Sequence, residues 1–194
     1  TEERQEVIAN RVEFGLKNGE TTFYLTNESG KAAVWAEKYP SSMFLFVCNL
    51  RSELIAKDLP NVYKLKGVDS LTAMDIALAN AFRQIDTSNL QPKRACIEIV
   101  SDALLQQRAV TTRRWLGGVV QELKSKGFIV LAVIDPSMHP SEEVNAIRGL
   151  FDGEIRITEK ETPEGTKQIL KIRKLINQKY SDKEIALNKE ALSD

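Results

Sequence analysis

Short apolar runs alternate along most of the chain with longer segments in which apolar residues recur every three or four positions. The runs are rich in β-branched and aromatic residues and lie at 21–25, 43–47, 62–65, 95–100 and 128–134. Helical periodicity is found at 2–17, 31–39, 51–57, 70–85, 103–126 and 141–150. Continuous apolar runs are typical of strands buried on both faces. The alternation therefore predicts an α/β fold, with a mainly parallel sheet covered by helices on both faces.

The last part of the chain has a different pattern. Residues 154–158 and 168–173 alternate apolar and polar side chains and flank the turn signal Thr162-Pro163-Glu164-Gly165. This pattern predicts an antiparallel hairpin at an edge of the sheet. We expect one domain over residues 1–180, because 194 residues are too few for two domains of ordinary size. The charged segment 181–194 is expected to be a terminal helix or a tail.

The charge balance argues against a nucleic-acid-binding protein. Lys and Arg number 27, as do Asp and Glu, so there is no global positive field. Arg113-Arg114 beside Trp115 could contact nucleic acid, but we favour a solvated basic pair beside a core tryptophan. No apolar run is long enough to span a membrane, and the first residues are charged. These features predict a cytoplasmic protein.

The two cysteines and the single histidine do not form a metal-binding pattern. Cys48 and Cys96 lie in or beside apolar runs, without a CxxC pair or a Cys/His cluster, so we expect buried, inert thiols. His139 lies between Met138 and Pro140, where we expect a solvated loop side chain. No metal site is predicted.

The sequence TNESGKAA, residues 26–33, follows the first predicted strand and opens a helix. A strand, a short loop, Gly-Lys and a helix is the layout of a phosphate-binding loop. Ser29, Gly30 and Lys31 are therefore candidates for binding a nucleotide or phosphate. The alternative is a simple loop-to-helix turn, in which Ser29 caps the helix and Lys31 is solvated.

Four segments carry a family resemblance, and they occur in the family's order. They are GLKNGETTFYL, KRACIEIVSDALL, TTRRWLGGVVQELKSKGFIVLAVID and LFDGEIRITEKETPEGTKQILKIRKL. In these segments the chain resembles the RecA-like P-loop ATPases, and within them the archaeal and bacterial KaiC-like group, from about Gly15 to Tyr180. The resemblance implies a three-layer RecA-like sandwich, with 128–134 as a central strand and a closing C-terminal hairpin. It also implies that Lys171 and Arg173 approach the nucleotide of a neighbouring subunit.

Compared with that family, the phosphate-loop candidate lacks two parts. Leu25 or Thr26 stands where the first glycine belongs, and neither allows the same close approach of backbone to phosphate. Ala32 follows the lysine and has no hydroxyl to hold magnesium. Gly30 and Lys31 are the positions that match.

The carboxylates of the family are also altered. Glu98 stands where family members usually carry aspartate, and its extra methylene moves the carboxylate outward. Cys48 and Asn49 occupy the place of the carboxylate that positions water, and Glu53 follows too far along the next helix. The resemblance therefore implies a nucleotide site with degenerate motifs.

These features favour a regulatory or protein-interaction module of signal transduction over an enzyme. We expect at most weak binding of ATP, ADP or phosphate, with magnesium disfavoured, and a protein partner or self-association. The alternative is a divergent ATPase that uses Lys31 and Glu98 and takes Lys171 or Arg173 from a neighbour in an oligomer. A third hypothesis, single-stranded DNA binding, is disfavoured by the balanced charge.

Overall fold

The computed structural model describes residues 2–187 and divides them into two compact units. The first is Val12–Val144, and the second combines the described residues of Thr1–Arg11 and Asn145–Asp194. Helices α1 (Glu2–Lys17) and α7 (Ser141–Arg148) each run from one unit into the other. Each unit is described below by itself.

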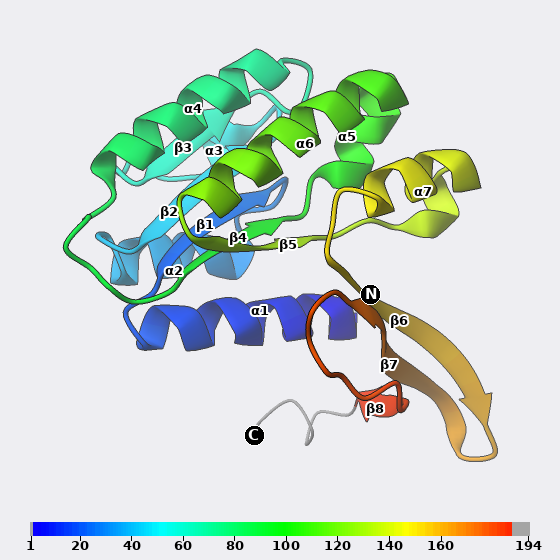
Figure 1. Ribbon diagram of the computed structural model, residues 1–194. Coiled ribbons are helices and arrows are strands. Elements are labelled where there is room, and N and C mark those ends of the chain that lie inside the picture. The colour runs from blue at the N-terminus through cyan, green and yellow to red at the C-terminus, as the bar shows by residue number, and fades with distance from the viewer. Residues whose placement is uncertain (1, 188–194) are drawn as a thin grey trace. The chain divides into compact units, whose positions relative to one another are not determined.

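The first unit is built on a parallel sheet of five strands in the order β3-β2-β1-β4-β5 (Figure 1). The strands are β1 (Thr21–Thr26), β2 (Met43–Cys48), β3 (Val62–Leu65), β4 (Lys93–Ile97) and β5 (Phe128–Ala132). All residues of β1 and β2 are buried, as expected for strands covered on both faces. The predicted α/β fold with a parallel sheet is confirmed. However, β5 lies at an edge of this sheet and not at its centre.

Helices cover both faces of the sheet. They are α2 (Gly30–Lys38), the short α3 (Ser52–Ile55), α4 (Leu71–Gln84), α5 (Val100–Gln106) and α6 (Ala109–Ser125). Figure 1 shows α4 and α6 over one face and α2 over the other. Ser70 caps α4 as its position predicts, because its Oγ accepts a hydrogen bond from Ala73 N. A 3₁₀ turn, η1 (Pro136–Met138), follows β5.

The single helix predicted over 103–126 is wrong, because the chain breaks it at Gln107. The backbone of Gln107 is extended (φ −110°, ψ 165°), and its Nε2 donates to the carbonyls of Val68 (3.2 Å) and Asp69 (3.0 Å). Thr112 Oγ1 donates to Ala103 O across the break. The apolar spacing continues on both sides, so periodicity alone does not reveal the interruption.

The core beneath α4 and α6 is an aromatic cluster around Phe23 of β1. The cluster places Phe44, Phe46, Phe82 and Phe128 with ring centroids 4.9–5.4 Å from that of Phe23. Tilted ring pairs at this spacing add to the free energy of burial. The cluster links the neighbouring strands β1 and β2, the helix α4 and the edge strand β5, and so fixes the sheet on which the candidate site lies.

The second unit contains a separate antiparallel sheet in the order β6-β7-β8. The long strands β6 (Gly153–Thr162) and β7 (Gly165–Leu175) form the predicted hairpin, and Thr162 Oγ1 donates to Gly165 O at the turn. The hairpin belongs to its own sheet and does not extend the parallel one. In the segment 181–194, Ile185–Leu187 form β8, and the remainder of the predicted helix or tail lies outside the described residues.

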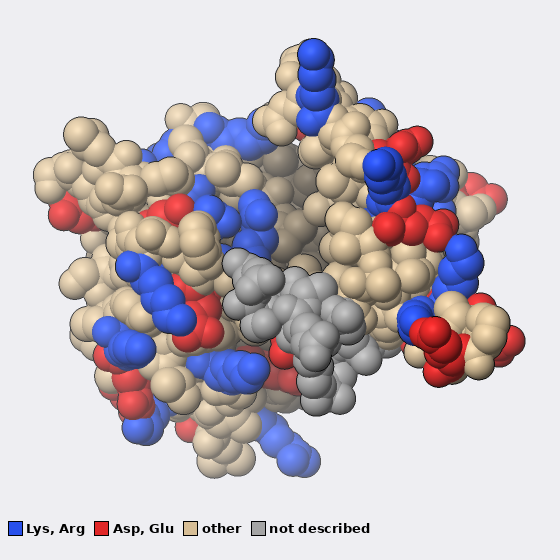
Figure 2. All heavy atoms as spheres, turned by 90° about the horizontal axis from the view of Figure 1, so that it is seen from below, with Lys and Arg blue, Asp and Glu red and all other residues tan. Residues whose placement is uncertain are grey.

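Basic and acidic side chains are intermixed over most of the face seen in Figure 2, as the balanced composition leads one to expect. Trp115 is buried, while Arg113 and Arg114 are exposed, which agrees with the solvated pair predicted there. Between residues 2 and 187, no helix is both long enough and apolar enough to cross a membrane.

Candidate functional site

The candidate residues of the first unit lie together where the parallel strands end, at their carboxyl ends. The strand order changes direction between β1 and β4, the position at which open parallel sheets form a ligand-binding crevice. Ser29, Gly30 and Lys31 follow β1, and Glu98 follows β4. The structure therefore places the phosphate-loop candidates and the candidate acid at the ends of neighbouring strands.

Only residues 27–29 connect β1 to α2, and their polar groups are partly used within the loop. The N–H of Glu28 donates to Thr26 Oγ1 (3.1 Å). Ser29 occupies the N-cap position in a helical conformation (φ −87°, ψ −50°), and its side chain makes no capping hydrogen bond. The predicted Ser29 cap is therefore wrong: capping requires an extended backbone, from which the side chain can turn back to the helix.

Gly30 and Lys31 are the first two residues of α2. Gly30 has φ +33°, and a Cβ at this position would meet nothing within 4 Å. Glycine is therefore favoured by the positive φ and not by a lack of room for a side chain. Lys31 is exposed, and the following Ala32 is buried. A helix N-terminus with a nearby ammonium attracts anions, but this loop lacks the run of glycines that wraps phosphates.

Glu98 is engaged by a tyrosine of the neighbouring strand. Tyr24 Oη donates to Glu98 Oε2 at 2.6 Å, while Glu98 Oε1 is buried and has no hydrogen-bond partner among the described residues. Burial raises the pKa of Tyr24, and the nearby Glu98 carboxylate raises it further. Tyr24 therefore remains a protonated donor, and one oxygen of Glu98 is held as an internal acceptor.

Asn49, Asn27 and Asp102 form a second polar link across the same edge. Asn49 Nδ2 donates to Asn27 O (2.8 Å), and Asn27 Nδ2 donates to Asp102 Oδ2 (2.9 Å). Burial raises the pKa of Asp102, and the hydrogen bond from Asn27 offsets part of that rise. The ends of β2 and β1 and the start of α5 are thus joined through side chains that otherwise could contact a ligand.

A third link joins the ends of β4 and β5. The N–H of Asp135 donates to Ser101 Oγ at 3.0 Å, and Asp135 Oδ1 accepts hydrogen bonds from the N–H and the hydroxyl of Ser137. Nearby in sequence, His139 is half-buried, and its Nε2 is buried without a hydrogen-bond partner in the described structure. The expectation of a solvated ring is therefore wrong for this nitrogen.

Neither cysteine joins a ligand cluster. Cys48 and Cys96 are both buried, as predicted, and neither forms a disulfide. Burial raises the pKa of the Cys48 thiol to about 12, and the charge of Asp102 contributes in the same direction. Across the part of the chain that the structure describes, no group of three or more His, Cys, Asp or Glu side chains is arranged to hold a metal ion.

Lys171 and Arg173 lie on β7 of the second unit. Lys171 is directly opposite Arg156 of β6, and Arg173 is exposed, with its carbonyl accepting a hydrogen bond from Tyr180 Oη. Two cations facing each other across a hairpin repel one another. The trans-acting role that the family resemblance implies for Lys171 and Arg173 stays a prediction.

Sequence reasoning identified the position of Asn49 but missed the contacts of Asn27 and Asp102. The available signal was positional, because each of the three residues follows a strand end by one to five residues. Carboxyl ends of parallel strands meet at one edge, so polar residues placed there are expected to be neighbours. The Tyr24–Glu98 hydrogen bond had no comparable signal, because Tyr24 lies inside an apolar strand.

Sequence comparison finds one family and no curated relative. The model of a family of unknown function, DUF7504, matches residues 50–157, which is more than half of the chain. Among curated proteins, none matches the chain.

Two solved structures from the archaeon Pyrococcus horikoshii are similar in fold. The KaiC-like protein PH0186 matches with a TM-score of 0.56 and 19% identity, over 89% of this chain and 74% of that one. The uncharacterized protein PH0321, solved in complex with an unknown peptide, matches with a TM-score of 0.61 and 13% identity, over 96% and 86% of the two chains. At these identities the likeness shows the fold alone, which is a RecA-like α/β fold.

Proposed function

The chain belongs to the DUF7504 family of unknown function, and we propose that it is a KaiC-like regulatory or protein-interaction module that does not hydrolyse nucleotides. Weak binding of ATP, ADP or phosphate at the start of α2 is compatible with this function. Hydrolysis is not, because the groups that would perform it are engaged in internal hydrogen bonds.

The engagement of Glu98 by Tyr24 is the observation that carries this proposal. A catalytic carboxylate must lie within hydrogen-bond reach of the group that it activates or of a metal-bound water. Here one oxygen of Glu98 accepts from Tyr24 Oη at 2.6 Å and the other is buried. Asn49, at the place of the second carboxylate, donates to the backbone of Asn27. These bonds stabilise the carboxyl end of the sheet, and Glu98 could act as a base only by giving up its bond to Tyr24.

An interaction role has a second, weaker support. PH0321, which shares this fold, was solved with a bound peptide. We propose that the present chain likewise acts through protein contacts, with its polar strand ends serving the structure and not a reaction.

A second candidate function is a divergent ATPase, favoured by two specific observations. Lys31 is exposed at a helix start, and Glu98 Oε1 has no hydrogen-bond partner among residues 2–187. A nucleotide bound there could contact the lysine, and a rotated Glu98 could orient water. This function requires that Glu98 exchange its bond to Tyr24 for a new one.

Calorimetry and a phosphate-release assay on the full chain distinguish the two. We expect no magnesium-dependent ATP hydrolysis above the blank, and at most millimolar affinity for ATP or ADP. Lys31→Ala should abolish any such binding, while Lys38→Ala, an exposed lysine at the opposite end of α2, should leave it unchanged. Hydrolysis that is lost in Lys31→Ala and Glu98→Gln but kept in Lys38→Ala would overturn the proposal in favour of the ATPase.

A further inference from the structure

The two edges of the parallel sheet differ in how they are protected. The edge strand β3 has only four residues and carries Lys64, whose Nζ contacts Asp58 Oδ1 (2.6 Å) and Glu53 Oε2 (3.1 Å). Short length and charge are the usual means by which proteins keep an edge strand from pairing with another chain. The β3 edge therefore has the features of a surface that stays unpaired.

The edge strand β5 is only one residue longer, but it carries no charged side chain. All five of its residues, Phe128–Ala132, are apolar, and its register with β4 has no bulge. Ile129 is 52% exposed, and residues 130–132 are only half-buried. Within the described residues, no strand pairs with its outer side. An apolar, regular and unprotected edge of this kind is a site for adding a strand.

Alternation along the strand shows which backbone groups are available. Val133 N donates to Ile97 O (2.9 Å), so the N–H groups of odd-numbered residues in this segment are directed to β4. The N–H and C=O groups of Val130 and Ala132 are consequently directed outward. They can form a second ladder without disturbing the first.

We propose that β5 pairs with β5 of a second copy of this chain, antiparallel about a two-fold axis, to give a continuous ten-stranded sheet. The order of charges at the two ends of the strand favours this direction. Lys124 and Lys126 precede the strand, and Asp135 follows it. Parallel pairing would place like charges together, whereas antiparallel pairing brings the basic end of each strand to the acidic end of the other. The contact is self-complementary and closes as a dimer.

The dimer rests on the edge alone and stands whether or not the chain hydrolyses a nucleotide. Pairing gives the outward N–H and C=O groups of Val130 and Ala132 hydrogen-bond partners in both copies. It also removes the Ile129 side chains from water. It leaves the β3 edges, with Lys64 at each, as the ends of the extended sheet. The assembly therefore stops at two copies.

Analytical ultracentrifugation of the full chain over a range of concentrations tests the proposal. We expect a species of about twice the 21.8 kDa monomer mass. Ile129→Lys should raise the dimer dissociation constant by about tenfold or more, because it places a charge at the pairing edge. Val130→Pro should act similarly, because it removes an outward N–H and leaves the bonds to β4.

Ile76→Lys is the matched control, since Ile76 is 59% exposed on α4, away from the edge. It should leave the dissociation constant unchanged, and circular dichroism checks that each variant is folded. A wild-type chain that stays monomeric at every concentration overturns the proposal. So does a dimer that folded Ile129→Lys leaves intact, because the second copy then binds another surface.

Discussion

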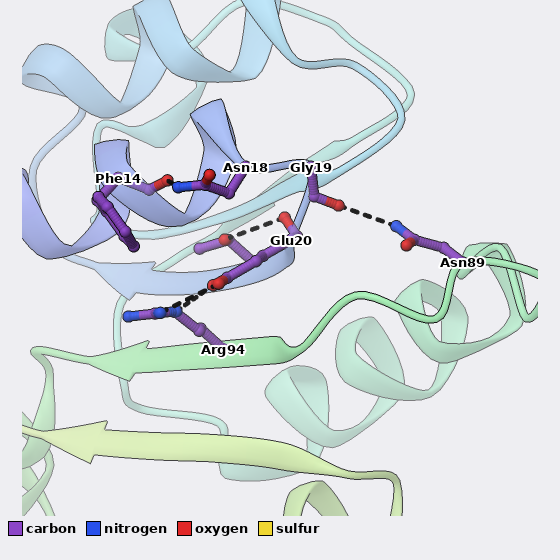
Figure 3. Close-up of polar contacts among 7 residues, drawn as sticks. Phe14, Asn18, Gly19, Glu20, Asn89 and Arg94 are labelled. Carbon is purple, nitrogen blue, oxygen red and sulfur yellow. Dashed lines mark hydrogen bonds and ion pairs between the residues drawn. The ribbon is translucent and has the colours of Figure 1, made fainter.

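Arg94 donates from both Nε and Nη2 to the carboxylate of Glu20, and this ion pair joins the amino end of β4 to the residue that precedes β1 (Figure 3). The Nη2–Oε1 distance is 3.1 Å, and the Glu20 side chain is 6% exposed. The guanidinium also lies 5.9 Å from the centroid of the Phe14 ring. The pair therefore fixes the end of α1 against the sheet at the amino ends of the strands, whereas the candidate site lies at their carboxyl ends.

Removing one partner of this pair should be costly. Arg94→Met leaves the Glu20 carboxylate buried without its cation, and we expect the free energy of unfolding to fall by about 3–5 kcal/mol. Urea unfolding followed by circular dichroism measures the change. The double variant Glu20→Leu/Arg94→Met should recover most of the loss, because it removes the buried charge as well.

The exposed pair Glu13–Lys17, at 3.3 Å on α1, provides the control. Lys17→Met should lower the free energy of unfolding by less than about 1 kcal/mol, because water screens both charges. Equal losses for Arg94→Met and Lys17→Met would contradict the role assigned to the buried pair.

Gly15 makes room for the same ion pair. A Cβ at this position would lie 2.8 Å from Glu20 Oε2 and 3.2 Å from Arg94 Cδ. Glycine to alanine within a helix ordinarily stabilises by about 0.5–1 kcal/mol. We expect the opposite sign for Gly15→Ala, with a loss of about 1–3 kcal/mol from overpacking. Gly118→Ala in α6, where a Cβ meets nothing within 4 Å, should give the ordinary gain, and thermal unfolding of both variants tests the contrast.

The fold could be predicted from the sequence because its signals are local. Continuous apolar runs such as 43–47 mark strands that helices cover on both faces, and the structure confirms β2 there. The break at Gln107 and the edge position of β5 were not predictable, because both depend on contacts between distant segments. Periodicity records which side of an element is buried and not which neighbour buries it.

The candidate site was predictable in location more than in contacts. The position of Gly30-Lys31 after a strand places it at the carboxyl edge of the sheet, where the structure has it. The hydrogen bonds of Tyr24 with Glu98 and of Asn27 with Asp102 span 74 and 75 residues of sequence. Neither pairing follows from spacing, because it requires the strand order and the side-chain directions.

The buried thiol of Cys48 should make the protein less stable in alkali. Burial raises its pKa from 9.0 to about 12, so the folded chain retains a proton that the unfolded chain loses. This contribution to stability is complete below about pH 9 and is lost as the pH rises toward 12. Between about pH 9 and 11 the free energy of unfolding should fall less steeply with pH in Cys48→Ala than in the wild type, by about 1.4 kcal/mol per pH unit. An unchanged slope in urea titrations would contradict this assignment.

Asn27→Ala should raise the pKa of Asp102. Burial already raises it, and the hydrogen bond from Asn27 Nδ2, at 2.9 Å, is the opposing influence that the variant removes. A carboxyl whose pKa is raised by folding binds its proton more tightly in the folded chain, so stability increases as the pH falls through that pKa. This increase should therefore begin at a higher pH in the variant, and NMR titration of the Asp102 side chain measures the shift directly.

Asn89→Ala, which removes the Nδ2 bond to Gly19 O at the amino ends of the strands, should leave the Asp102 titration unchanged. A titration of Asp102 that is the same in Asn27→Ala and the wild type would show that the Asn27 bond does not form in solution, and with it the polar link from Asn49 to Asp102.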